Sequence, residues 1–363
     1  MPPLTRLAVG YRLPAAVTPA SGQTLMEAIR EHCPAIGELY FAGLGEPSGR
    51  LPLGLDSALS NEEIQRQLLT DLEAASAMGI ELTLLFNAAC YGEDALSQRL
   101  ADYVCRRVSQ LRAKLNLAGV TTTSPMIAAV VKAHFPEVRT KASVNLRIDT
   151  IQAAEYVAPY FDEFYLRREY NRDLGRLREF RAWADRHGKR LAILANSGCL
   201  PYCSGQSFHD NLVAHDAEAA EVPAVAFNPA ICRPYYMDAA NRVRLLQSTW
   251  IRPEDTHHYG GLVDTIKLAT RMHADPAQVI RAYAEGRFAG NLLDLLEPGH
   301  QGVLAGGTLD NAAFPDDWFA TTAACQKDCH RGCGYCAAVL RRVLRHPDRN
   351  STRRKNEDPS HRV

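Results

Sequence analysis

Segments with strand character and segments with helix character alternate along this chain of 363 residues. Short apolar runs predict strands at residues 7–11, 38–43, 82–90, 119–124, 141–146, 163–169, 190–196 and 264–271. A segment with apolar residues every three or four positions follows all but the seventh and predicts a helix. The clearest helix start is at Ser60, since Glu63 completes a capping box. Eight strands in this alternation predict an α/β fold, a (β/α)8 TIM-like barrel.

A doubly wound parallel sheet is the alternative fold. It requires a glycine-rich phosphate loop after the first strand, and residues 11–19 contain no glycine. We therefore expect a barrel over residues 1–300, with a cysteine-containing insertion at 197–264 between the seventh and eighth strands. Residues 301–344 are expected to form a small cysteine-rich C-terminal segment. Residues 345–363 are polar without apolar periodicity and are expected to be a disordered tail.

Charge and hydropathy exclude several classes of protein. The 41 basic and 41 acidic residues argue against nucleic-acid binding through bulk charge, although a local basic patch remains open. Neither a signal-peptide pattern nor an apolar run of membrane-spanning length is present, so we expect a cytoplasmic protein with no membrane partner. Disulfides are rare in that compartment, and the ten cysteines are expected to be thiols or metal ligands. Cys33 and Cys105 fall within amphipathic helical patterns and are expected in the core.

Four cysteines lie within twelve residues near the C-terminus: Cys325, Cys329, Cys333 and Cys336. The last three match the CxxxCxxC motif of radical-SAM enzymes, but that motif normally follows the first barrel strand. A fourth thiolate would also fill the open iron position that this chemistry requires. A closed four-thiolate site for an iron–sulfur cluster, or for zinc as the alternative, is the favoured interpretation. The spacing leaves open the alternative that these cysteines bind nothing.

A second group of cysteines lies in the insertion. Cys199 and Cys203 follow the seventh strand on the face where barrel active sites form, and Cys232 comes later in the same insertion. Cys90, at the end of the third strand, is a candidate fourth ligand or a buried thiol. Spacing alone does not exclude a C-terminal segment that folds back and combines both groups into one site.

Several segments resemble the collagenase-like peptidase U32 family over residues 5–275. They are RREYNRDLGRL, NSGCLPYC, STWIRPED and DTIKLATR. The chain departs from the family pattern at Tyr170, where leucine is usual, and at Thr270, where glycine is usual. The C-terminal run of four cysteines is not part of that pattern, so the chain resembles a divergent member with an extra cysteine cluster.

The resemblance implies a barrel that carries an oxygen-sensitive 4Fe–4S cluster on cysteines of the insertion. Cys199 and Cys203 match cluster ligands and Cys232 is a third candidate, while the fourth ligand does not map. Relatives carry out oxygen-independent hydroxylation. Some act in ubiquinone biosynthesis as heterodimers, and others modify ribosomal or transfer RNA bases with prephenate as oxygen donor. The implied function is an iron–sulfur enzyme of anaerobic metabolism with one cluster or two. A related partner subunit fits this pattern, as does the alternative that this chain is itself a non-catalytic subunit.

Polar residues at the predicted carboxyl ends of the strands supply the remaining candidates. The catalytic candidates are Arg168, Glu169, Asn196, Lys267 and Arg271, and the cofactor-binding candidates are Asn87, Ser143, Asn145 and His209. The three cations among them suit a carboxylate such as that of prephenate. Glu169 is a candidate general base, or the partner of Arg168 in an ion pair. A peptidase is less favoured because neither GxSxG nor HExxH is present.

Overall fold

Eight parallel strands close into a barrel in the computed structural model, which describes residues 5–14, 19–44, 46, 48–49, 53, 59–215 and 230–346. The strands are β1 (Arg6–Gly10), β2 (Ile36–Phe41), β3 (Glu81–Phe86), β4 (Leu117–Thr122), β5 (Arg139–Ala142), β6 (Glu163–Tyr165), β7 (Arg190–Leu194) and β8 (Thr265–Leu268). Each strand pairs with the next in the sequence, and β8 closes the barrel by pairing with β1. The predicted barrel is confirmed, and the doubly wound alternative is wrong.

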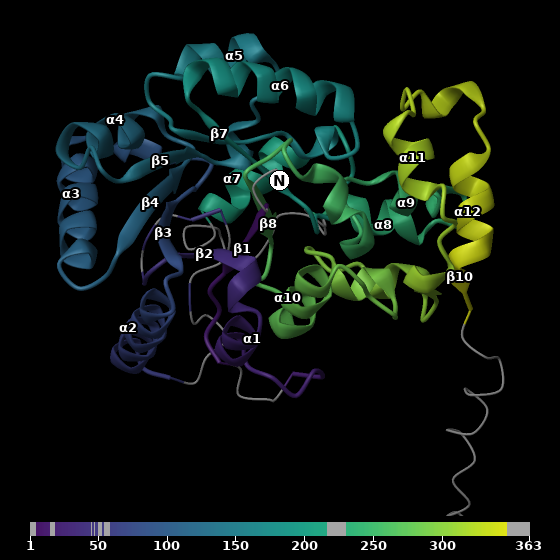
Figure 1. Cartoon of the computed structure of the whole chain (residues 1–363), viewed down its shortest axis with the longest axis horizontal. Helices are drawn as coiled ribbons and strands as arrows, with labels where there is room; N and C mark the ends of the chain where they lie inside the picture. The colour runs from purple at the N-terminus through teal and green to yellow at the C-terminus, as the bar shows by residue number, and fades with distance from the viewer. Residues whose placement is uncertain are drawn as a thin grey trace, which may run out of the picture.

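Helices surround this barrel, as Figure 1 shows. They are α1 (Leu25–Glu31), α2 (Asn61–Ala77), α3 (Gln98–Arg112), α4 (Pro125–His134), α5 (Ile151–Val157), α6 (Leu174–His187) and α10 (Pro276–Glu285). The capping box predicted at Ser60 and Glu63 is present and begins α2, because the two side chains satisfy backbone N–H groups that the helix leaves unpaired. In the described part of the chain, no helix combines the length and apolar character that crossing a membrane requires.

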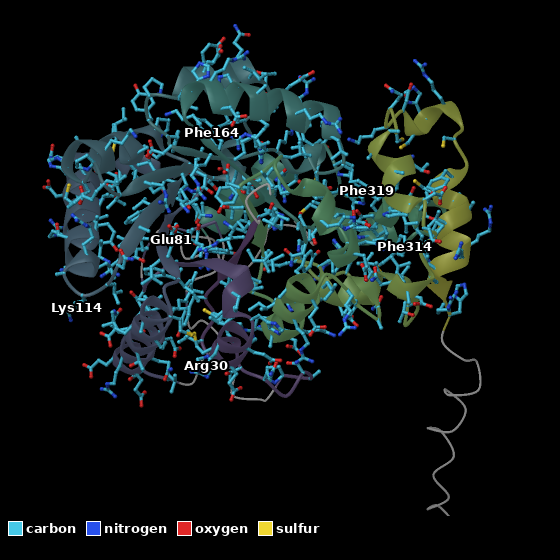
Figure 2. All side chains as sticks on the ribbon, in the orientation of Figure 1. Arg30, Glu81, Lys114, Phe164, Phe314 and Phe319 are labelled. Carbon is cyan, nitrogen blue, oxygen red and sulfur yellow. The ribbon has the colours of Figure 1, made fainter. Side chains whose placement is uncertain are left out.

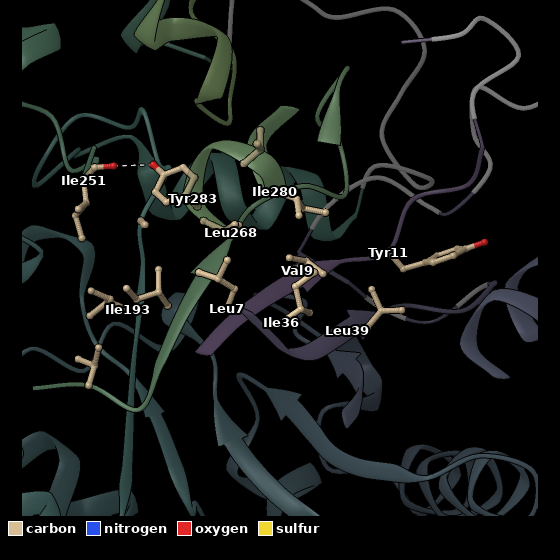
Figure 3. Close-up of a cluster of buried hydrophobic side chains, with 14 of the residues drawn as sticks. Leu7, Val9, Tyr11, Ile36, Leu39, Ile193, Ile251, Leu268, Ile280 and Tyr283 are labelled. Carbon is tan, nitrogen blue, oxygen red and sulfur yellow. Dashed lines mark hydrogen bonds between the residues drawn. The ribbon is translucent and has the colours of Figure 1, made fainter. Parts of the chain in front are cut away.

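The main core lies between the strands and these helices (Figure 3). Val9 of β1, Leu39 of β2 and Leu268 of β8 are completely buried there, and Ile280 of α10 belongs to the same cluster. Burying each such side chain stabilises the fold by about 1.5–3 kcal/mol. The hydroxyl of Tyr283 donates a hydrogen bond of 2.6 Å to the carbonyl of Ile251, which ties α10 to the segment before β8.

The inside of the barrel is charged. Lys141 of β5 donates to Glu38 of β2, and its Nζ lies 3.3 Å from Glu163 Oε2. Strands β2 and β5 are not neighbours, so this contact crosses the barrel interior. Burial lowers the pKa of Lys141, but the two carboxylates outweigh it and the pKa is raised, so the ammonium stays charged. Gly119 makes room for this lysine, since a Cβ there would lie 2.8 Å from Lys141 Cε.

Several strands end earlier than the sequence predicts. Residues 143–146, which were predicted to continue the fifth strand, form the 3₁₀ helix η3 (Val144–Leu146), and those after β6 form η4 (Arg168–Tyr170). The 3₁₀ turn η2 (Gly92–Asp94) precedes α3, whose start is capped by Ser97. Side-chain caps begin η3 at Ser143 and α3 at Ser97, whereas η2 and η4 have no side-chain cap.

The insertion and the C-terminal segment pack together at one side of the barrel (Figure 1). The insertion contains α7 (Gln206–Ala214), α8 (Cys232–Met237), η6 (Ala239–Asn241), α9 (Arg244–Gln247) and η7 (Pro253–Tyr259). After α10 come η8 (Leu292–Leu295), η9 (Gln301–Leu304), β9 (Thr308–Leu309), η10 (Asn311–Ala313), α11 (Trp318–Ala323), η11 (Cys329–Arg331), α12 (Tyr335–Val343) and β10 (Leu344–Arg345). Strand β10 pairs with β9, so the predicted start of the tail at residue 345 falls within a strand. The rest of that expected tail, 347–363, lies outside the described residues.

Aromatic side chains hold the C-terminal segment against the insertion. Trp318 of α11 stacks on Trp250 with ring centroids 5.7 Å apart, and Phe314 contacts both rings. Phe319 stacks on His258 of η7 at 3.9 Å. Figure 2 shows Phe314 and Phe319 where the C-terminal helices meet the rest of the molecule. The C-terminal segment is therefore a docked part of the fold.

Candidate functional site

A cavity of about 490 Å³ lies between the barrel rim, the insertion and the C-terminal segment. Its lining comes from three parts of the chain that are far apart in sequence. They are residues 168–172 after β6, insertion residues at 200–204, 231–249, and C-terminal residues at 322–336. Cys203 of the insertion lines it together with Cys325, Cys329 and Cys336 of the C-terminal segment. The C-terminal segment thus folds back onto the rim, and both cysteine groups reach one cavity.

Arg168 and Glu169 line this cavity but do not pair with each other. The Glu169 carboxylate accepts from the backbone N–H of Tyr202 at 2.9 Å and from Arg167 Nε at 3.1 Å. Arg168 Nη1 donates to Ser197 Oγ at 3.2 Å. The expected Arg168–Glu169 ion pair is therefore wrong, because the neighbouring Arg167 takes that carboxylate. Within the described ranges, no carboxylate lies within ion-pair distance of Arg168, which is only 7% exposed.

The three cysteines of the insertion lie near one another beside the cavity. Burial, together with the charges of Cys199 and Cys203, raises the pKa of the Cys232 thiol to about 11. Cys232 opens α8, and Cys203 lies just before α7. The donor set fits zinc or an iron–sulfur cluster, both of which thiolates bind well.

The loop that carries Cys199 is held in place by Asn196 and Gly198, the first and third residues of the Asn-x-Gly-Cys segment. Asn196 Nδ2 donates to the carbonyls of Ala269 and Leu295, and its Oδ1 accepts from the Ala269 N–H. A Cβ on Gly198 would lie 2.6 Å from His300 Cδ2, so only glycine fits there. The structure thus places Asn196, expected as catalytic, as an anchor of backbone between β7, β8 and η8.

The four C-terminal cysteines surround η11 and the start of α12. The backbone N–H of Lys327 donates to Cys325 Sγ at 3.2 Å. Burial raises the pKa of the Cys336 thiol; Arg172 lowers it, while Cys329, Cys325 and Cys333 raise it further. Across the described residues, no three His, Cys, Asp or Glu side chains are already grouped so that they could hold a metal ion. Either cysteine group would have to draw its sulfur atoms closer together to bind one.

Cys90, the candidate fourth ligand, has a different neighbour. A hydrogen bond from His215 lowers the pKa of its thiol, and the Gly92 N–H at 3.4 Å lowers it further. The thiol is half-buried, and His215 follows α7 directly. Cys33 and Cys105, expected in the core, are half-buried and pack against it.

The remaining polar candidates form a second cluster or stand apart from the cavity. Arg271 Nη1 donates to Ser48 Oγ at 2.7 Å, and Asn87 Oδ1 accepts from the Gly49 N–H at 3.2 Å. Asn145 approaches the same glycine, and Ser143 caps η3 by accepting from the Asn145 N–H. Lys267 Nζ lies inside the barrel, 4.0 Å from the ring centroid of Tyr40 and 4.8 Å from that of Tyr165. His209 lies in α7. None of the six is among the described residues that line the cavity.

No protein-family model matches the chain. A known protein is similar to it in sequence, and a solved structure is similar to it in fold. The chain is 27% identical over 295 residues to a protein of Methanocaldococcus jannaschii named "Uncharacterized protease MJ1657", which covers 77% of this chain and 81% of the relative. The solved structure of the U32 peptidase Mk0906 superposes with a TM-score of 0.51 and 16% identity, over 73% of this chain and 92% of that one. The chain therefore shares the barrel fold of that U32 peptidase and resembles the Methanocaldococcus jannaschii protein in sequence.

Sequence reasoning missed three cations that line the cavity: Arg172, Arg244 and Lys327. The signal for Arg172 was its position four residues after Arg168 in the same segment. Its Nη2 donates to the carbonyls of Leu246 and Ser248, and its Cζ lies 5.0 Å from the ring centroid of Trp250. Because burial outweighs its neighbours, the pKa of Arg172 is lowered. Arg172 thereby links the barrel rim to the insertion and to α11.

Proposed function

We propose that this chain is an iron–sulfur-dependent enzyme that modifies a small anionic molecule held in the cavity. One observation carries the proposal: Arg168, a buried cation without a carboxylate partner in the described part of the chain, lines the same cavity as the rim cysteine Cys203. A buried charge without a partner is costly in free energy, and an anionic ligand would remove that cost. A scaffold subunit would not require such a cavity, so this arrangement favours an enzyme.

The chain's own residues have distinct parts in this proposal. Arg168 binds the carboxylate or other anionic group, for which a planar guanidinium is suited. Leu200, Ile231 and Leu246 form an apolar wall that excludes water from the body of the ligand. Glu169, which lines the cavity beside Arg168, is the candidate proton acceptor.

Cys199, Cys203 and Cys232 would hold the cluster, which supplies electron transfer or an open iron when bound. Oxygen-independent hydroxylation is the reaction that the resemblance favours. A related second subunit belongs to the same proposal, since relatives with that chemistry work in pairs.

The test uses protein purified without oxygen. Iron and acid-labile sulfide are measured per chain, with EPR spectra, for the wild type, Cys199→Ala and the control Cys105→Ala. Cys105 is also a half-buried cysteine but packs against the barrel core. We expect iron and sulfide to fall in Cys199→Ala alone. Equal iron and sulfide in all three proteins would contradict the cluster.

The anion site is tested separately by binding. Benzoate and hexanoate serve as probes, since each joins a carboxylate to an apolar body. We expect both to raise the Tm of the wild type and Arg30→Gln, an exposed control, but not that of Arg168→Gln. Loss of a charge-assisted hydrogen bond of about 1.5–3 kcal/mol corresponds to roughly a 10- to 150-fold loss of affinity. An unchanged response in Arg168→Gln would remove the anion site from the proposal.

A cysteine peptidase is the second candidate, favoured by one observation. The Cys90 thiol lies beside His215, which lowers its pKa, and both named relatives are called protease or peptidase. A nucleophilic cysteine requires such a thiol and a histidine partner. Hydrolysis of casein by the wild type but not by Cys90→Ala would establish this function, and hydrolysis by neither protein would exclude it for this substrate.

A further inference from the structure

Arg172 is a buried cation whose charge the described carboxylates do not neutralise. It is only 9% exposed, and its hydrogen bonds go to the neutral carbonyls of Leu246 and Ser248. Its Cζ also lies 5.3 Å from the ring centroid of Trp318. Among the residues that the structure describes, no carboxylate lies within 4 Å of this guanidinium. A buried charge of this kind requires a compensating negative group nearby.

Three of the C-terminal thiols, Cys325, Cys329 and Cys336, line the same cavity as Arg172. The groups whose charges act on Arg172 are, largest first, Tyr259, Cys336, Asp255 and Cys325. Burial raises the pKa of Tyr259 well above its usual range, so its hydroxyl stays neutral. Asp255 already lies 3.4 Å from Arg252, which takes up its charge. The thiols are therefore the anionic candidates that remain without a cation of their own.

Two further cations surround the same thiols. Lys327 lies between Cys325 and Cys329 in sequence, and its Nζ lies 3.9 Å from Asp173. Arg244 lines the cavity with Cys329, and its Nη1 donates to Gln247 at 2.7 Å. With Arg172, three cations line the cavity near the cysteines. Two carboxylates lie beside them: Asp173, next to Lys327, and Asp328, which precedes Cys329 and pairs with His330 and Arg331. These three cations complement the negative charge of a metal centre held by thiolates.

The local backbone also suits a metal site. Lys327 has φ of 59° and Gly332 has φ of 81°, so a left-handed residue lies between Cys325 and Cys329 and another between Cys329 and Cys333. The hydrogen bond from the Lys327 N–H to Cys325 Sγ is of the kind that supports a metal-bound thiolate.

We propose that Cys325, Cys329, Cys333 and Cys336 bind one metal centre, zinc or an iron–sulfur cluster, whose negative charge is complemented by Arg172, Arg244 and Lys327. Four thiolates around one Zn²⁺ carry a net charge of −2, and each thiol releases its proton on binding. Cys325 and Cys333 are exposed, so the sulfur atoms can move together without disturbing the core. This centre is separate from the proposed rim cluster, although both line the same cavity.

The experiment measures zinc, iron and sulfide per full-length chain, purified without oxygen, in the wild type, Cys333→Ala, Cys199→Ala and Cys105→Ala. Cys333 is exposed and lines no part of the core, so its removal leaves the fold intact. We expect Cys333→Ala to lose metal that Cys199→Ala and Cys105→Ala keep. Unchanged metal in Cys333→Ala would overturn the proposal. Loss of the same metal in Cys199→Ala would overturn it too, because the two groups would then form one site.

The outcomes for the two sites are distinguishable. If the rim cluster does not exist, Cys199→Ala keeps all its metal while Cys333→Ala still loses the C-terminal share.

The role of Arg172 is tested by release of the metal to EDTA from Arg172→Lys and Arg172→Met. We expect release at least tenfold faster from Arg172→Met. If that variant does not fold, Lys327→Gln against Lys327→Arg gives the same comparison at a partly exposed position. Equal release rates within each pair would refute charge complementation.

Discussion

Removal of the Trp318 side chain is expected to detach the C-terminal segment from the barrel. The indole is 1% exposed and contacts the rings of Trp250, Phe314 and Tyr335 as well as the Arg172 guanidinium. Truncating a buried tryptophan to alanine costs about 3–5 kcal/mol. Here most of that cost should fall on the contact between α11 and the insertion, because the strands and helices of the barrel make none of these ring contacts.

The assay combines urea denaturation with limited proteolysis of Trp318→Ala. We expect a new transition at low urea, and early cleavage within residues 301–346 while the barrel fragment stays intact. Trp183→Ala is the matched control. Trp183 lies in α6 and is equally buried, but its ring packs against that of Phe164, with centroids 5.2 Å apart. It should lose similar stability without selective cleavage near the C-terminus. A loss below about 1 kcal/mol in Trp318→Ala, or the same cleavage pattern in both variants, would refute the reasoning.

Three further predictions concern single residues. Burial raises the pKa of Asp255 to about 6, so between about pH 4 and 6 the folded state holds this proton while the unfolded state releases it. The free energy of unfolding should therefore fall by up to about 3 kcal/mol as pH rises through that window. Asp255→Asn should remove this part of the pH dependence in denaturation curves. At neutral pH, Cys90 should react with iodoacetamide faster than Cys105, because the pKa of Cys90 is lowered and burial raises that of Cys105. The difference in rate should close above pH 9. Mass spectrometry of the labelled peptides measures both rates, which would be equal if His215 has no effect. Gly198→Ala should destabilise the Cys199 loop by about 1–3 kcal/mol because its Cβ meets a ring, and an unchanged Tm would contradict this close contact.

The sequence contained enough information for the barrel but not for the cavity. Eight periodic segments were sufficient, because a strand's apolar pattern is local and the capping side chains at Ser60 and Glu63 are adjacent to the helix they begin. The strand ends also placed Arg168 and Lys267 correctly near the carboxyl edge of the sheet. That edge fixes neither the direction of a side chain nor its partner. Lys267 accordingly lies inside the barrel against Tyr40, whereas Arg168 lines the cavity.

The cavity depends on contacts between segments that no local pattern relates. Arg172 meets Trp318 across almost 150 residues of chain, through an insertion whose length gave no hint of its path. The Asn-x-Gly-Cys segment was recognised in the sequence, but the reason why asparagine and glycine occupy these positions was not. Asn196 holds backbone carbonyls and Gly198 fits beneath His300, and both contacts involve residues beyond β8.

The docked C-terminal segment has a consequence for how the molecule is assembled during synthesis. The barrel strands leave the ribosome before Cys325 and Trp318 do, and domains generally begin to fold in that order. The cavity therefore has only two of its three walls until α11 reaches Trp250. A chain whose synthesis stops before residue 318 would retain all eight barrel strands but would lack the lid of its own site. Docking of α11, and not closure of the barrel, is the step that completes the cavity.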